Sequence, residues 1–113
     1  MTDKHLQERI IKKIKHLDPY KVILFGSYAY GYPSDDSDID LLVVTNDEFV
    51  PKNFNEKNRI FLNVASALYD IEKDFPIDLI VHTKPMHKRF IELNSMFSRK
   101  ILTDGKVIYE RNN

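Results

Sequence analysis

Apolar residues recur along this chain at two spacings, one typical of helices and the other of strands. In residues 3–17 they return every three or four positions, which predicts an amphipathic helix that ends before Asp18 and Pro19. The same spacing predicts a helix over 56–75, stopped by Pro76, and a mainly helical segment over 85–101. The stripes expected to face the core are Leu6, Ile10, Ile14 and Leu17 in the first, Ile60, Val64, Ala67, Leu68, Ile71 and Phe75 in the second, and Met86, Phe90, Leu93, Phe97 and Ile101 in the third.

Short apolar runs between these helices predict four strands, at 21–25, 38–44, 77–82 and 106–109. The run at 38–44 is apolar at every position after Asp40, so we expect a central strand that is covered on both faces. A helical turn is predicted from Ser27 to Tyr32, and a polar loop over 31–37. Strands that alternate with helices indicate an α/β (α+β) fold, a sheet layered with helices.

The length of 113 residues fits one domain, so we expect a single domain over residues 1–113. The chain has no cysteine, which excludes a disulfide framework and a thiolate metal site. No apolar run reaches the roughly 18 residues that a membrane-spanning helix needs, and the N-terminal residues do not resemble a signal peptide. The expected compartment is therefore the cytoplasm, with no membrane partner.

Charge is balanced overall but unevenly distributed along the chain. Residues 1–21 carry a net charge of +3, residues 22–83 carry −7 and residues 84–113 carry +4. The acidic centre would repel a nucleotide unless bound cations or the basic flanks neutralise it. Solvated surface charge is the alternative explanation. Because no basic stripe dominates, direct nucleic-acid binding is not expected.

One motif carries most of the chemistry. Gly26 and Ser27 follow the first strand, and ten residues later Asp38 and Asp40 open the second. Carboxylates two positions apart on a strand point to the same face, about 7 Å from each other. Glycine allows a phosphate to approach the backbone, and serine offers a hydroxyl and an amide. The pattern favours a divalent cation held beside a phosphate, although Gly26 and Ser27 alone would suit an ordinary strand-to-helix turn.

The third strand repeats the second. Residues 39–43 and 77–81 share the pattern Ile-Asp-Leu-apolar-Val, which places Asp78 in the position of Asp40. An aspartate within an apolar strand is costly unless something satisfies it. Two such strands indicate that both carboxylates converge on one cation; the alternative is that Asp78 is a solvated residue at a strand start.

These residues resemble the signature of the polymerase-beta-like nucleotidyltransferases, and most closely that of their minimal single-domain members, the MNT family. The resemblance implies a mixed sheet of about four strands flanked by helices. It also implies that Asp38, Asp40 and Asp78 are catalytic and hold two Mg²⁺ ions, and that Gly26 and Ser27 bind the substrate ATP. Asp78 would complete the second metal site and help to deprotonate the acceptor hydroxyl.

The sequence departs from the family at one position. Many relatives carry Arg shortly after Gly-Ser, where this chain has Tyr30, which cannot neutralise a triphosphate. A basic residue elsewhere would then have to substitute, and Lys84, Lys88 and Arg89 are candidates by charge alone.

The chain has 35 residues after the third aspartate, which leaves little room for a domain that grips an acceptor. The acceptor is therefore expected to be a protein with its own binding surface. Leu62 and Tyr69, away from the buried stripe of their helix, suggest an interface, or else they pack under another element. Minimal members of the family are commonly paired with a HEPN-domain toxin, so the resemblance implies an antitoxin that transfers AMP to a tyrosine of that toxin.

Two alternatives stay open. One is a binding antitoxin that neutralises its toxin by occlusion, which Tyr30 favours and the intact carboxylates oppose. The other is a nucleotidyltransferase acting on a small hydroxylated molecule, which the lack of an acceptor domain opposes. The sequence specifies neither the nucleotide base, nor the acceptor, nor whether the chain forms a homo-oligomer.

Overall fold

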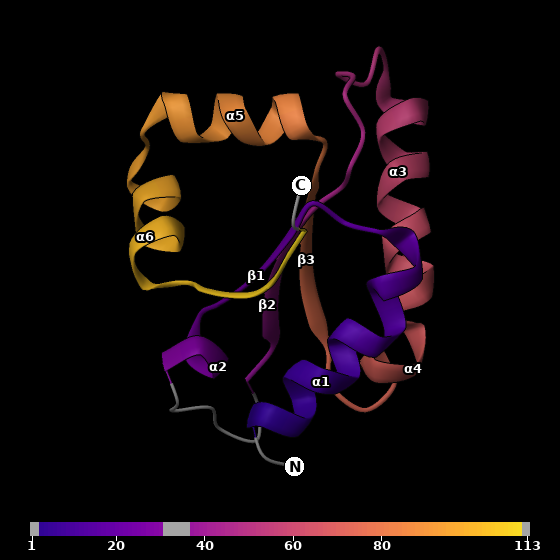
Figure 1. Ribbon diagram of the computed structural model, residues 1–113, viewed down its shortest axis with the longest axis vertical. Helices are drawn as coiled ribbons and strands as arrows, with labels where there is room; N and C mark the ends of the chain where they lie inside the picture. Colours follow the sequence, from indigo (N-terminus) through magenta and orange to yellow (C-terminus); the bar gives the residue numbers. More distant parts are fainter. Residues whose placement is uncertain (1–2, 31–36, 112–113) are drawn as a thin grey trace.

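The computed structural model describes residues 3–30 and 37–111 of the chain (Figure 1). The predicted residues 31–36 of the polar loop lie outside the described residues. In chain order the elements are α1 (Asp3–Ile14), a 3₁₀ turn (Lys15–Leu17), β1 (Lys21–Phe25), α2 (Ser27–Tyr30), β2 (Ile39–Val44), α3 (Phe54–Ala67), α4 (Tyr69–Glu72), β3 (Ile77–His82), α5 (Lys84–Leu93), α6 (Met96–Asp104) and β4 (Lys106–Glu110). Within the described part, none of these helices is long and apolar enough to cross a membrane.

The four strands form one mixed sheet in the order β3-β2-β1-β4. β1 pairs antiparallel with both β2 and β4, whereas β2 pairs parallel with β3. The predicted mixed sheet of about four strands is therefore confirmed, and β3 and β4 are its edge strands.

Helices cover both faces of the sheet, so each strand side chain is directed into one of two cores. The first, which we call the α1 face, packs Val22, Leu24, Leu41 and Val43 against α1, α3 and α4. The second, the α6 face, packs Ile23 and Leu42 against α5 and α6 through Phe90 and Ile101. Each buried aliphatic side chain contributes about 1.5–3 kcal/mol. Leu41 to Val44 are at most 1% exposed, as expected for a central strand.

The second long predicted helix is two helices in the structure. It begins at Phe54 rather than at residue 56, because the Asn53 side chain accepts a hydrogen bond of 2.9 Å from the Glu56 amide and caps the helix. It is then interrupted at buried Leu68, before α4.

The segment 85–101 is also divided, into α5 and α6. Asn94 has a left-handed backbone (φ 49°) that ends α5, and the Ser95 hydroxyl accepts from the Ser98 amide at 3.0 Å to start α6. This turn changes the direction of the chain, so Leu93 is 62% exposed and its predicted place on the buried stripe was wrong. Phe97 is 49% exposed, whereas Ile101 is buried as expected.

Candidate active site

Asp40 and Asp78 lie directly opposite each other on adjacent parallel strands. On the other side of β2, Asp40 lies opposite Phe25, the last residue of β1. Residues paired in this way share a face, so both carboxylates lie on the α6 face, on strands about 4.8 Å apart. Asp38 comes two residues earlier, exposed just before β2 begins. The structure thus brings the three predicted carboxylates to one end of the sheet.

The repeated Ile-Asp-Leu-apolar-Val pattern has a direct structural cause. Ile39 pairs with Ile77, Asp40 with Asp78 and Val43 with Val81, so the two copies lie side by side in register. A one-residue shift in the register of β3 would turn Ile77 away from the α1-face core and direct Asp78 into it. The apolar positions therefore fix the register that brings the two carboxylates together. Asp78 is exposed, as the alternative interpretation required, yet it is also adjacent to Asp40.

The electrostatics of this end are unfavourable in the absence of a cation. Burial raises the pKa of Asp40 above its ordinary value, and the nearby charges of Asp78 and Asp38 raise it further. A group that is both partly buried and repelled by like charges is typical of a functional site.

Gly26 contacts the Asp40 side chain and has a left-handed backbone, with φ of 72°. A Cβ added here would overlap Oδ2 of Asp40 and lie 2.9 Å from its Cγ. Both the backbone angle and the space therefore require glycine. Ser27 starts α2, whose first turn is closed by a 3.0 Å hydrogen bond that the Ala29 amide donates to the Gly26 carbonyl. Gly26 and Ser27 thus border the acid pair.

Among the described residues, no group of three or more His, Asp or Glu side chains is placed so that it could hold a metal ion by itself. Mg²⁺ rarely needs such a cage, because it binds through one or two carboxylates, retained waters and the phosphates of its substrate. Asp40 and Asp78 provide oxygen ligands of this kind, and a cation would relieve their mutual repulsion. The donor set therefore fits a magnesium–nucleotide complex better than a permanent metal site.

The cations that the sequence offered as replacements for the missing arginine lie elsewhere. Lys84, Lys88 and Arg89 belong to α5, which follows the far end of β3, and α5 and α2 lie at opposite ends of the sheet (Figure 1). Lys84 is bound there, 2.9 Å from Glu48 Oε1. The side chain of Tyr30 lies outside the described residues.

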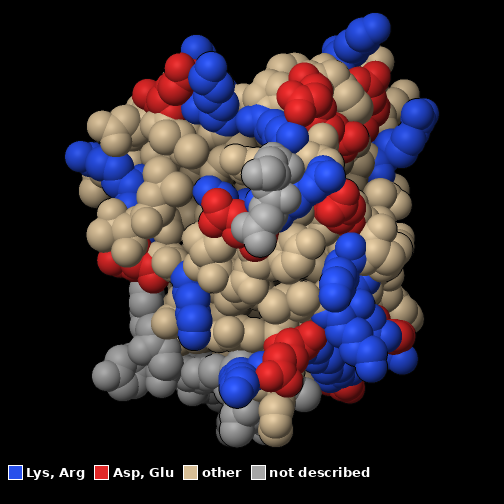
Figure 2. All heavy atoms as spheres, in the orientation of Figure 1, with Lys and Arg blue, Asp and Glu red and all other residues tan. Residues whose placement is uncertain are grey.

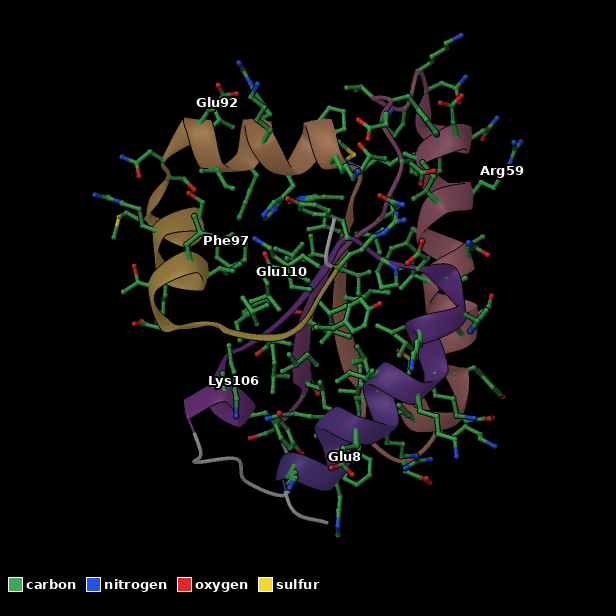
Figure 3. All side chains as sticks on the ribbon, in the orientation of Figure 1. Glu8, Arg59, Glu92, Phe97, Lys106 and Glu110 are labelled. Atoms are coloured by element: carbon green, nitrogen blue, oxygen red, sulfur yellow. The ribbon has the colours of Figure 1, made fainter. Side chains whose placement is uncertain are left out.

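Lys106 is a cation at the same end of the sheet as the acid pair, but it lies on the α1 face, because it pairs with Leu24 of the α1-face core. It starts β4 opposite Leu24, two residues before Gly26, and is exposed (Figure 3). Lys106 forms no ion pair with another described residue. Only the pairing of β4 with β1, which no local pattern predicts, places it there.

The second apolar side of α3 and α4 stays open. Leu62 is 51% exposed and Tyr69 is 61% exposed, so neither is covered by another element of the described structure. On the face shown in Figure 2, basic and acidic side chains are interspersed rather than gathered into one stripe.

The family model "Polymerase beta, Nucleotidyltransferase" matches residues 8–113. The chain therefore belongs to the polymerase-beta nucleotidyltransferase family, as the motif had indicated. Among curated proteins it is similar to the "Putative protein adenylyltransferase MJ0604" of Methanocaldococcus jannaschii. The two are 30% identical over 89 residues, which span 79% of this chain and 77% of the relative.

Solved structures share the fold. A toxin–antitoxin crystal structure with AMP-PNP matches with a TM-score of 0.57 and 24% identity, over 94% of this chain and 74% of the other. A tri-AMPylated HEPN toxin of Shewanella oneidensis in complex with MNT antitoxin matches with a TM-score of 0.51 and 23% identity, over 96% and 73%. Because both structures are less than 25% identical to this chain, the similarity concerns the fold alone.

Proposed function

We propose that this nucleotidyltransferase transfers AMP from ATP to a tyrosine hydroxyl of a partner HEPN-domain toxin, and that it acts as the antitoxin in a magnesium-dependent reaction. The observation that carries the proposal is the pair Asp40 and Asp78, held in register beside Gly26. Support for the acceptor comes from the adenylyltransferase relative and from the toxin–antitoxin complexes that share the fold.

In the reaction the acceptor oxygen attacks the α-phosphorus of ATP. A bond forms between these two atoms, the bond from the α-phosphorus to the oxygen bridging to the β-phosphate breaks, and pyrophosphate leaves. Asp78 is exposed at the edge of the site and accepts the hydroxyl proton. Gly26 leaves room for the carboxylate of Asp40, and the Gly26 backbone together with the Ser27 hydroxyl and amide would bind the phosphates.

Asp38, Asp40 and Asp78 would hold Mg²⁺, with two ions expected. When bound, magnesium lowers the pKa of the acceptor hydroxyl and neutralises charge on the leaving pyrophosphate. Asp40 suits this role because burial and its two acidic neighbours disfavour its ionised form, and a bound cation would offset that cost.

A second candidate is an antitoxin that acts by occlusion. Tyr30, in the place of the frequent arginine, is the observation that favours it. The two candidates differ in whether the carboxylates are needed for neutralisation.

The test is to incubate the protein with ATP, Mg²⁺ and the product of the neighbouring gene, and to search for an AMP adduct by intact mass. Asp78→Asn should slow transfer by about 100- to 10,000-fold, as expected for loss of a general base. Asp104→Asn changes an exposed carboxylate at the end of α6 and should have no effect. A complex that neutralises the toxin without any adduct would support occlusion instead.

A further inference from the structure

The outer edge of β3 has unpaired backbone groups. The Ile39 amide donates to the Pro76 carbonyl at 2.8 Å, and the Thr45 amide donates to the His82 carbonyl at 2.7 Å, so even-numbered residues of this segment bond towards β2. Because successive residues of a strand alternate in direction, Leu79 and Val81 direct their amide and carbonyl groups outwards. No other described residue pairs with them there, which makes this edge a template for another strand.

An apolar groove runs along this edge. A cavity of about 330 Å³ is lined by Leu79 and Val81, which lie on the α1 face, and also by Ile80 and His82, which lie on the α6 face. Because both faces contribute, the cavity straddles the edge of the strand rather than lying over one face. Its walls come from the two helices on either side: Phe54, Lys57, Asn58 and Phe61 of α3, and Met86 of α5.

The groove continues beyond the strand end. Two adjoining hollows, of about 410 and 540 Å³, share Val50 and Met86 with each other, and Met86 also lines the first cavity. Their apolar side chains are open to solvent: Phe54 is 76% exposed and Val50 is 60% exposed. An exposed apolar surface of this kind, next to a free strand edge, is characteristic of peptide recognition by strand addition.

Charge indicates what fills the groove. Lys52, Lys57 and Arg89 line its three parts, and Glu92 is the single acidic residue among their lining side chains. An acidic segment would therefore be attracted.

The other end of the same edge is the candidate active site. Asp78 lies on β3 one residue before Leu79 and on the α6 face. In an added strand, the residue opposite Asp78 would lie about 4.8 Å away and direct its side chain to the same face. A hydroxyl-bearing residue at that position would be presented to the acid pair. The far end of the groove, at His82, lies four residues or about 13 Å along the strand.

We propose that the β3 groove binds the acceptor protein through an extended segment that adds to the sheet. The segment carries a hydroxyl residue opposite Asp78, alternating apolar residues along the groove, and acidic residues about four positions away, near Lys57. This assignment rests on the proposed function for the fate of the hydroxyl, but the docking itself requires no chemistry.

The probe is a fluorescein-labelled eight-residue peptide with tyrosine near one end, alternating valine and threonine, and two glutamates at the other end. Fluorescence anisotropy without ATP should detect its binding to the full chain. Lysine in place of the two glutamates should weaken binding. N-methylation of alternate peptide amides should abolish binding, because those amides would donate to the β3 edge.

Matched variants on α3 test the groove. Phe54→Ala and Lys57→Glu should each weaken peptide binding about fivefold or more. Leu62→Ala and Arg59→Glu change a comparable apolar and a comparable basic residue of the same helix that do not line the groove, and should leave the affinity unchanged. Arg59 projects from the outer side of α3 (Figure 3).

Amide hydrogen exchange supplies the decisive readout. Bound peptide should slow exchange at Leu79 and Val81, whose amides point outwards, but not at Ile80, which already faces β2. Binding without that protection, binding unaffected by N-methylation, or a dimer in sedimentation that closes the β3 edge would overturn the proposal. ATP binding, measured separately by calorimetry, should be unchanged in the groove variants. If the native chain binds the peptide but does not bind ATP, the proposed function is refuted and the groove assignment stands.

Discussion

Acidification should destabilise this protein through His82, which ends β3. The imidazole packs in an aromatic cluster, with ring centroids 5.0 Å from Phe90 and 5.9 Å from His87. Its buried Nδ1 has no hydrogen-bond partner among the described residues. Burial, followed by the charges of His87 and Lys57, lowers the pKa of His82 from 6.5 to about 4. The folded state therefore favours the neutral ring.

The size of the effect follows from the two pKa values. Stabilisation by the neutral ring is complete above pH 6.5, the unfolded value, and is lost as pH falls towards 4. A difference of one in pKa corresponds to about 1.4 kcal/mol. The full loss is thus at most about 3 kcal/mol, and because solvent screens the partly exposed ring, about 1–2 kcal/mol of it should occur between pH 7.5 and pH 5. Burial also lowers the pKa of His87, which adds in the same direction.

Urea unfolding at several pH values, followed by far-ultraviolet circular dichroism, measures this dependence; the chain has no tryptophan for fluorescence. His82→Phe keeps the ring packing but removes the titrating group, so it should reduce the loss over this interval by at least about 1 kcal/mol. His16→Gln changes an exposed histidine of the 3₁₀ turn and should retain the native dependence. Identical dependence in the native chain and in His82→Phe would refute the reasoning.

Three further predictions concern the acid end. Gly26→Ala should cost about 1–2 kcal/mol of stability from its left-handed backbone alone, and should displace Asp40; an unchanged thermal unfolding midpoint would contradict this. Asp78→Asn should lower the pKa of Asp40 by removing one of the charges that raise it, which carboxylate NMR can follow; an unshifted titration would argue against their proximity. Lys106→Ala should leave ATP binding in calorimetry unchanged, because Lys106 pairs with Leu24 and so lies on the α1 face, opposite the acid pair; weakened binding would contradict this assignment of faces.

Much of the sheet could be predicted because its strands are marked locally. β1 and β3 have the predicted bounds, 21–25 and 77–82. The repeated pattern around Asp40 and Asp78 also indicated that the two carboxylates converge, and the parallel pairing of the two copies in register brings them together. Gly26 could be recognised as special, although its contact with Asp40 could not.

What the sequence did not reveal depends on long-range packing. The interruption at Leu68 falls within an unbroken stripe of apolar residues and has no local stop signal. Leu68 is buried in the core against the sheet, so the break depends on packing that the local sequence does not show. The turn at Asn94 depends on the left-handed backbone of that residue, and the composition of the segment does not distinguish this turn from a continuous helix. Lys84 was considered because charge alone does not tell which end or which face of a sheet a residue occupies: Lys84 lies at the far end, and Lys106, at the acid end, lies on the opposite face.

The position of β3 connects these features. β3 is an edge strand with one catalytic candidate, Asp78, at its start. The apolar groove and the unpaired backbone groups lie along the rest of the strand. An exposed strand edge can orient an acceptor with main-chain hydrogen bonds alone. Because strand pairing fixes both register and side-chain direction, it would place one residue of the acceptor next to Asp78 and exclude its neighbours. On this view, selection of the acceptor residue depends on register along β3, and a one-residue shift in the acceptor segment would remove its hydroxyl from the site.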